Sequence, residues 1–284
     1  MKRFIYIIMV ALACAACSKD DTPAADATGT VAMTFNVSGD FTLTTNPMTR
    51  ALTSDGKDMT DVWCLDYVGG VLQQQVHQTS TDADFGVPTL DLSIGTHHLY
   101  FVASRGTSPV LNTEAKTLTF TKVLDTFWRH YEITITSGTS SGSRAVSLDR
   151  VVTKLKVVFS DAIPTNAATF NITPTAWHYG FNYQTGNPTA ATSQVITINI
   201  PNASIGATGE SINVFGFSTT AEWNTNVAIV CKAANNDVLG SASLVGVPFK
   251  RNRVSEYTGP LFGDSGSMTL SLNTSWDDTY QGTW

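Results

Sequence analysis

The sequence predicts an all-β protein with two antiparallel β-sandwich domains in tandem. Apolar and polar residues alternate with a period of two in many short runs, as expected for half-buried strands. The apolar period of a helix never lasts more than a couple of turns, and its best candidate, residues 59–68, is weak. Seven consecutive Ser, Gly and Thr residues at 137–143 predict a linker near the middle of the chain.

The first sixteen residues have the pattern of a secretory signal peptide. Lys2 and Arg3 precede an uncharged stretch, 4–16, that is too short to cross about 30 Å of hydrocarbon as a permanent helix. Cleavage before Cys17 would leave an N-terminal cysteine, the layout of a bacterial lipoprotein. We therefore expect acyl chains on Cys17 to anchor the chain in the outer membrane, facing the cell surface. Acylation of Cys14 and cleavage at another site remain alternatives; Cys17 is favoured because the polar run starts directly after it.

The composition suits an exported protein that does not bind nucleic acid. Its 284 residues suit two domains, and its hydrophobic content of 42% is ample for two cores. Without residues 1–16 the chain keeps 15 of its 17 basic residues and all 23 acidic ones, a net charge of -8. An acidic surface repels phosphate backbones, so nucleic-acid partners are not expected.

The strand pattern places the domains. Residues 17–30 are small and polar and are expected to form a flexible tether, followed by an N-terminal domain at 31–143 and a C-terminal domain at 144–284. In the first expected strand the apolar positions are Val31, Met33, Phe35 and Val37. Further strands are expected around 99–103, 118–120, 131–135, 155–159, 170–172, 196–200, 212–214, 227–229, 245–249 and 268–272.

No catalytic residue, metal ligand or cofactor is assigned. Residues 263–267, Gly-Asp-Ser-Gly-Ser, superficially resemble the nucleophile loop of trypsin-like proteases, but the histidine setting of such enzymes is missing and these are turn residues. His97 and His98 are adjacent, and adjacent residues on a strand point to opposite faces. A hydrolase built from two strand-borne carboxylates stays an alternative, although nothing singles out a pair.

Two further groups of residues have open interpretations. Cys64 and Cys231 both lie in apolar strand patterns, where free cysteine behaves as a small hydrophobe, and a disulfide between them is the alternative. Trp177, Tyr179, Phe181 and Tyr183 form an aromatic cluster. In a loop, Trp177 and Tyr179 could stack on a sugar ring, but packing of the whole cluster as one strand face is favoured.

Three segments, in this order after a lipoprotein start, resemble the fimbrillin family, the subunits of type V pili. They are Gly-Thr-His-His-Leu-Tyr-Phe-Val-Ala at 95–103, Arg-Val-Val-Thr-Lys-Leu-Lys-Val at 150–157, and Val-Pro-Phe-Lys-Arg-Asn-Arg-Val at 247–254 with its continuation to Phe262. The resemblance implies two transthyretin-like β-sandwich domains, export as a lipoprotein and a structural role without catalysis. It also implies other fimbrial subunits as partners.

The resemblance further implies assembly by donor-strand exchange. In polymerising fimbrillins a trypsin-like protease cuts after an arginine, the first strand leaves, and a neighbouring subunit supplies its replacement. Here the cut would separate Arg50 from Ala51 and remove the strand at 31–37. The alternatives are that Arg50 is a solvated loop residue, that the chain is an anchor or tip subunit, or that it is a surface glycan-binding lipoprotein that does not polymerise.

Overall fold

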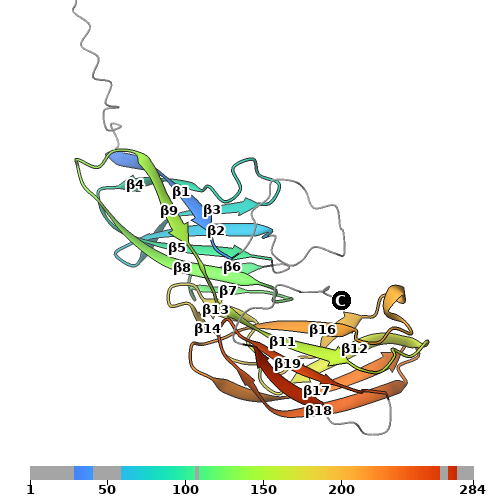
Figure 1. Ribbon diagram of the computed structural model, residues 1–284. Helices are drawn as coiled ribbons and strands as arrows, with labels where there is room; N and C mark the ends of the chain where they lie inside the picture. The colour runs from blue at the N-terminus through green and yellow to red at the C-terminus, as the bar shows by residue number, and fades with distance from the viewer. Residues whose placement is uncertain (1–28, 41–58, 106–108, 263–267, 274–284) are drawn as a thin grey trace, which may run out of the picture.

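The described residues form an all-β structure, as predicted. The computed structural model describes residues 29–40, 59–105, 109–262 and 268–273, and strands make up nearly all of its regular structure (Figure 1). One short 3-10 helix, Asn202–Ser204, is the exception within these ranges. No helix in this part of the chain is long and apolar enough to cross a membrane.

The N-terminal domain is a sandwich of two sheets. Its smaller sheet has the order β4-β1-β9, with β1 at Thr30–Ser38, β4 at Thr89–Ser93 and β9 at Gly142–Ser147. The facing sheet has the order β10-β8-β5-β2-β3. Its strands are β2 (Asp61–Val68), β3 (Val71–Thr79), β5 (Gly95–Ser104), β8 (Thr126–Ile135) and β10 (Asp149–Arg150). Apolar side chains from both sheets fill the space between them.

The C-terminal domain is a second sandwich (Figure 1). One sheet has the order β16-β11-β19-β20, with β11 (Val152–Phe159), β16 (Ser211–Phe217), β19 (Val254–Gly259) and β20 (Thr269–Asn273). The other has the order β15-β12-β17-β18, with β12 (Ala167–Pro174), β15 (Ile196–Asn199), β17 (Trp223–Ala233) and β18 (Val238–Phe249).

The two domains share one topology. In each, the first strand pairs in parallel with a strand from late in the domain, β1 with β9 and β11 with β19. On its other side the first strand pairs antiparallel, β1 with β4 and β11 with β16. β20 extends the C-terminal sheet beyond β19, whereas no described strand covers the outer edge of β9.

A small sheet joins the two halves of the chain. Its order is β14-β13-β7-β6, with β6 (Val110–Asn112), β7 (Thr117–Thr119), β13 (Gly180–Asn182) and β14 (Asn187–Pro188). The central pair, β7 with β13, therefore bonds the first half of the chain to the second. Figure 1 shows this sheet between the two sandwiches, where a third apolar core draws residues from both halves.

The predicted domain boundary differs from the structure, whereas the favoured interpretations of the cysteines and of the weak helical pattern agree with it. The domain boundary expected near residue 143 lies later, because β9 and β10 belong to the N-terminal sandwich and the C-terminal one starts with β11 at Val152. The Ser, Gly and Thr run ends in β9 and is a connection within a domain, not a linker. The weak helical pattern at 59–68 does not form a helix, because residues 61–68 form β2. Cys64 and Cys231 are free and buried in different cores, which confirms the favoured interpretation and excludes the disulfide.

Candidate functional site

β1 lies in the middle of its sheet and is hydrogen-bonded on both sides. Met33 lies opposite Leu90 in the antiparallel pairing with β4, and Val37 lies opposite Val146 in the parallel pairing with β9. The antiparallel bonding extends to the residue before β4, where the backbone amide of Phe35 donates to the carbonyl of Pro88 at 2.9 Å. A chain lacking β1 would therefore leave the facing edges of β4 and β9 without a partner.

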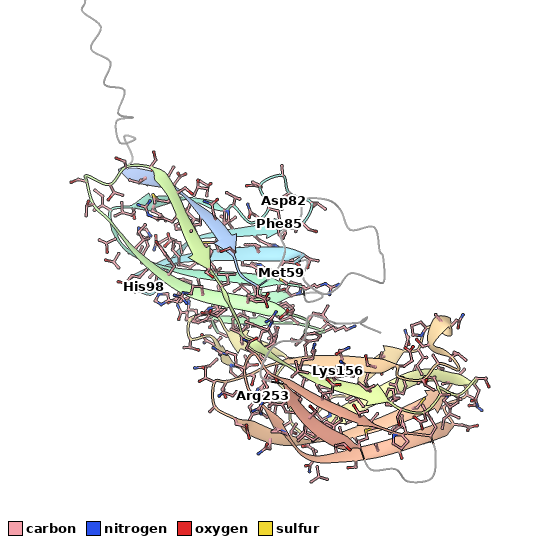
Figure 2. The ribbon with its side chains drawn as sticks, in the orientation of Figure 1. Met59, Asp82, Phe85, His98, Lys156 and Arg253 are labelled. Atoms are coloured by element: carbon pink, nitrogen blue, oxygen red, sulfur yellow. The ribbon has the colours of Figure 1, made fainter. Side chains whose placement is uncertain are left out.

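The inner face of β1 is part of the N-terminal core. Val31, Met33, Phe35 and Val37 are 8%, 0%, 0% and 7% exposed, so the predicted alternation is present. The ring centroid of Phe35 lies 5.3 Å from that of Phe101 on the facing sheet. The same core includes Met59 and Phe85, which are labelled in Figure 2. The inner side chains of β1 thus complete one of the two apolar layers that form this core.

Polar contacts fix the outer face of β1 weakly. The hydroxyls of Thr34 and Thr89 lie 3.0 Å apart, and the amide of Asn36 donates to Ser143 at 2.6 Å. Both contacts are exposed to solvent, where such bonds contribute little net stability. The burial of the inner face, together with the backbone bonds, is therefore the main force that holds β1.

A buried arginine lies at the end of β1. The guanidinium of Arg150 donates to both carboxylate oxygens of Asp125, at 2.8 Å and 3.0 Å, and stacks over the ring of Phe127. It also donates from two nitrogens to the carboxylate of Asp40, each at 3.2 Å, and to the side-chain oxygen of Asn252 at 3.0 Å. Arg150 therefore connects the segment after β1, the N-terminal domain and the C-terminal domain.

The charges in this cluster are not equally buried. The side chain of Arg150 is 3% exposed and that of Asp125 is 6% exposed, whereas that of Asp40 is 58% exposed. Burial raises the pKa of the Asp125 carboxyl, and the guanidinium of Arg150 opposes that rise by favouring the charged form. This cluster was not predicted from the sequence, in which an arginine directly before Val151 and Val152 is its one visible sign.

The predicted sugar contact at Trp177 is wrong for this fold. Trp177 is 1% exposed, packs edge-on against Phe249 at 4.9 Å and donates from its indole nitrogen to the carbonyl of Phe215 at 3.0 Å. A ring without a free face cannot stack on a sugar. The favoured alternative, one strand face, is also wrong, because Trp177 lies in the C-terminal core whereas Phe181 and Tyr183 lie in the third core.

Tyr179 is in a different position from Trp177. It is partly buried, its hydroxyl has no hydrogen-bond partner in the described structure, and burial raises its pKa to about 12. Together with Val123, Asn213 and Phe215 it lines a cavity of about 250 Å³. A contact between Tyr179 and a ligand stays a prediction.

The histidine pair is split between two environments, as adjacent strand residues should be. His97 is buried, with one ring nitrogen 2.8 Å from the carboxylate of Asp66 and the other 2.8 Å from the carbonyl of Ser93. His98, labelled in Figure 2, stacks on His130 instead. Nowhere in the described part of the chain do three His, Cys, Asp or Glu side chains lie together as metal ligands would. Cys17, Arg50 and Ala51 lie outside the described residues.

Comparison with solved structures identifies the fold. The structure is similar to that of a candidate adhesin from Bacteroides ovatus, with a TM-score of 0.52 and 12% identity, over 92% of this chain and 97% of that chain. The two proteins share one fold. A candidate polysaccharide-binding protein from Bacteroides thetaiotaomicron matches with a TM-score of 0.50 and 7% identity, over 88% of this chain and 100% of that chain.

The tip fimbrial protein Mfa3 from Porphyromonas gingivalis, in a form with a C-terminal truncation, is also similar. Its TM-score is 0.48 and its identity 13%, over 87% of this chain and 100% of that chain. No protein-family model matches the sequence, and the search of curated proteins found no significant match. The matches with TM-scores of 0.52 and 0.50 show the all-β fold.

Proposed function

We propose that this protein is a pilin or accessory subunit of a bacterial surface fimbrium, which assembles by strand exchange after losing its first strand. The observation that carries the proposal is the position of β1, a central strand whose four apolar side chains are buried in the N-terminal core. Burial of each such side chain contributes about 1.5 to 3 kcal/mol of stabilising free energy. The four side chains of β1 together therefore contribute roughly 6 to 12 kcal/mol before the opposing entropy is subtracted. An uncut subunit keeps its strand and stays a monomer.

A cut between β1 and β2 changes this balance. Arg50 lies between these two strands in the sequence. Once cut, β1 is a separate peptide, and its departure opens an apolar slot flanked by unpaired strand edges, which are strong templates for strand addition. The replacement must alternate apolar and polar residues, as β1 does, because only one of its faces meets the core. Strand exchange needs no cofactor and no catalytic residue.

The adhesive part of the role has separate support. The similar structure from Bacteroides ovatus is described as a candidate adhesin, which motivates a role in attachment. An outer-membrane lipid on Cys17 would hold the uncut subunit at the cell surface. Since Cys17 precedes β1 and Arg50 follows it, one cut would release both the anchor and the strand.

The test of strand exchange is limited cleavage with an arginine-specific protease. The wild type is expected to yield a new N-terminus at Ala51 and then high-mass species that resist detergent, seen by size-exclusion chromatography and N-terminal sequencing. The Arg50→Gln variant should stay monomeric. Arg144→Gln, which replaces an exposed arginine on β9, is the matched control and should behave as the wild type. Trimmed protein that stays monomeric in every condition would rule out polymerisation.

The lipid is tested by labelling cells with a palmitate analogue. We expect Cys17→Ser to abolish incorporation and Cys14→Ser to leave it unchanged. If Cys14→Ser removes the label instead, the anchor lies on the other cysteine.

A further inference from the structure

We infer that Arg150 and Asp40 form a latch that holds the trailing end of β1 and slows its departure. This inference rests on the proposed function, because it concerns the strand that leaves. Asp40 follows β1 by two residues and lies on the side of the strand that leads to Arg50. After a cut behind Arg50, Asp40 stays with the departing strand, near its new free end. Strands fray from their ends, so a contact here controls the first step of release.

Arg150 stays in place without Asp40. Both carboxylate oxygens of Asp125 accept hydrogen bonds from it, Phe127 supports the guanidinium plane at 4.5 Å, and Asn252 accepts a further bond. A preorganised guanidinium loses little side-chain freedom when Asp40 binds, unlike a pair of flexible surface residues. The contact is therefore stronger than an ordinary surface ion pair of the same length.

The charges make the latch reversible. Losing the only carboxylate beside a buried guanidinium is strongly destabilising, because the charge is left uncompensated. Here Asp125 remains beside Arg150 when Asp40 leaves, so the buried charge of Arg150 is still paired with a carboxylate. The partner that moves, Asp40, is also the exposed one, and water can hydrate it as soon as it leaves. The loss of Asp40 therefore leaves no unpaired buried charge in the protein that remains after β1 has left.

Arg150 also connects the latch to the domain junction. Asn252 lies in the turn between β18 and β19, and its amide donates to the carbonyl of Val152 at the start of β11. Arg253, the next residue along, is labelled in Figure 2 at the junction end of the C-terminal domain. A donor strand that fills the vacated slot can replace the apolar contacts of β1, but it restores the latch only if it carries an acidic residue at the same place.

The experiment measures how fast the cut strand leaves. Wild-type protein and the Asp40→Asn variant are cut with the arginine-specific protease, and loss of the peptide is followed by mass spectrometry in an excess of a labelled synthetic peptide with the sequence of residues 30–50. We expect Asp40→Asn to speed release about three- to tenfold, more than the loss of an ordinary surface ion pair would, because Arg150 is held in place by its other partners. Release from the wild type should also quicken with added salt, and this salt dependence should nearly vanish in the variant.

Asp149→Asn is the matched control. Asp149 neighbours Arg150 but pairs with Arg129 at 2.8 Å, so removing its charge should leave the release rate unchanged. Equal rates and equal salt dependence in the wild type and Asp40→Asn would overturn the latch. If cut protein releases its strand but never polymerises, the proposed function fails while the latch is still measured.

Uncut protein gives a second, independent reading. Amide hydrogen exchange of β1 should be faster in Asp40→Asn than in the wild type, with no protease involved. If the protease does not cut behind Arg50, this measurement alone decides the inference, and unchanged exchange in β1 overturns it.

Discussion

The phenol oxygens of Tyr67 and Tyr183 lie 2.6 Å apart and join residues 116 positions apart in the chain. Tyr67 belongs to β2 of the N-terminal sandwich, whereas Tyr183 follows β13 in the second half. Both rings are buried in the third core, where the amine of Lys116 lies 3.4 Å from the oxygen of Tyr67. Burial is the main cause that raises the pKa of Tyr183 above its ordinary value, so this phenol stays protonated.

This bond should couple the two halves of the molecule. Tyr183→Phe is expected to lower the free energy of unfolding by about 1 kcal/mol, since it leaves the hydroxyl of Tyr67 with one partner fewer. A double-mutant cycle with Tyr67→Phe, measured by urea denaturation, should give a coupling energy of roughly 0.5 to 1.5 kcal/mol. Tyr131→Phe on β8 serves as a control variant. Additive effects of the two substitutions would mean that the contact contributes nothing.

Phe35 should be among the most sensitive positions of β1. Phe35→Ala removes a fully buried ring next to Phe101, and a substitution of this kind lowers the free energy of unfolding by about 3 to 5 kcal/mol. Ala32→Ser, on the exposed face of the same strand, should change it by less than about 0.5 kcal/mol. Chemical denaturation of the uncut protein measures both. Similar losses in the two variants would show that β1 is not held by its inner face.

Gly216 makes room for Trp177. A Cβ atom at this position would lie 2.5 Å from the indole ring, and the ring is fixed by its bond to Phe215. Gly216→Ala should therefore lower the free energy of unfolding by about 1 to 3 kcal/mol, as overpacking does, and should shift the tryptophan fluorescence. Gly138→Ala is the control, because nothing lies within 4 Å of its added atom. An unchanged melting temperature in Gly216→Ala would contradict this packing.

His178 should make stability depend on pH. Burial lowers the pKa of its imidazole, whose Nδ1 donates to the carbonyl of Thr189. The folded state therefore binds a proton less readily than the unfolded state, and the free energy of unfolding falls as the pH drops below the ordinary value of 6.5 towards the lower folded pKa. We expect His178→Gln to flatten the stability profile between about pH 7 and about pH 5.

Urea denaturation across that range gives the slope. Some slope should remain in His178→Gln, because burial, and secondarily His98, lowers the pKa of His130 in the same direction. A profile identical to the wild type would mean that His178 is equally easy to protonate in both states.

Strands with one face in water could be predicted from the sequence. β1 and β17 alternate buried and exposed positions, so their period of two is visible. β2 could not be found in this way, because six consecutive residues, Val62 to Tyr67, are buried and leave no alternation. β9 was also missed: it is an exposed edge strand of mostly polar residues, and its composition is that of a loop.

The sequence by itself determined that β1 is a strand and which of its side chains face a core, since both follow from the local alternation. Only the tertiary structure decided that β1 lies between β4 and β9, because strands pair through backbone hydrogen bonds that do not depend on which side chains the residues carry. The tertiary structure also brought Asp40 and Asp125 to Arg150, across 110 and 25 positions of sequence. It buried Trp177, whose aromatic cluster the sequence alone allowed to lie in an exposed loop. These are contacts between distant segments, and they form only when the two sandwiches close.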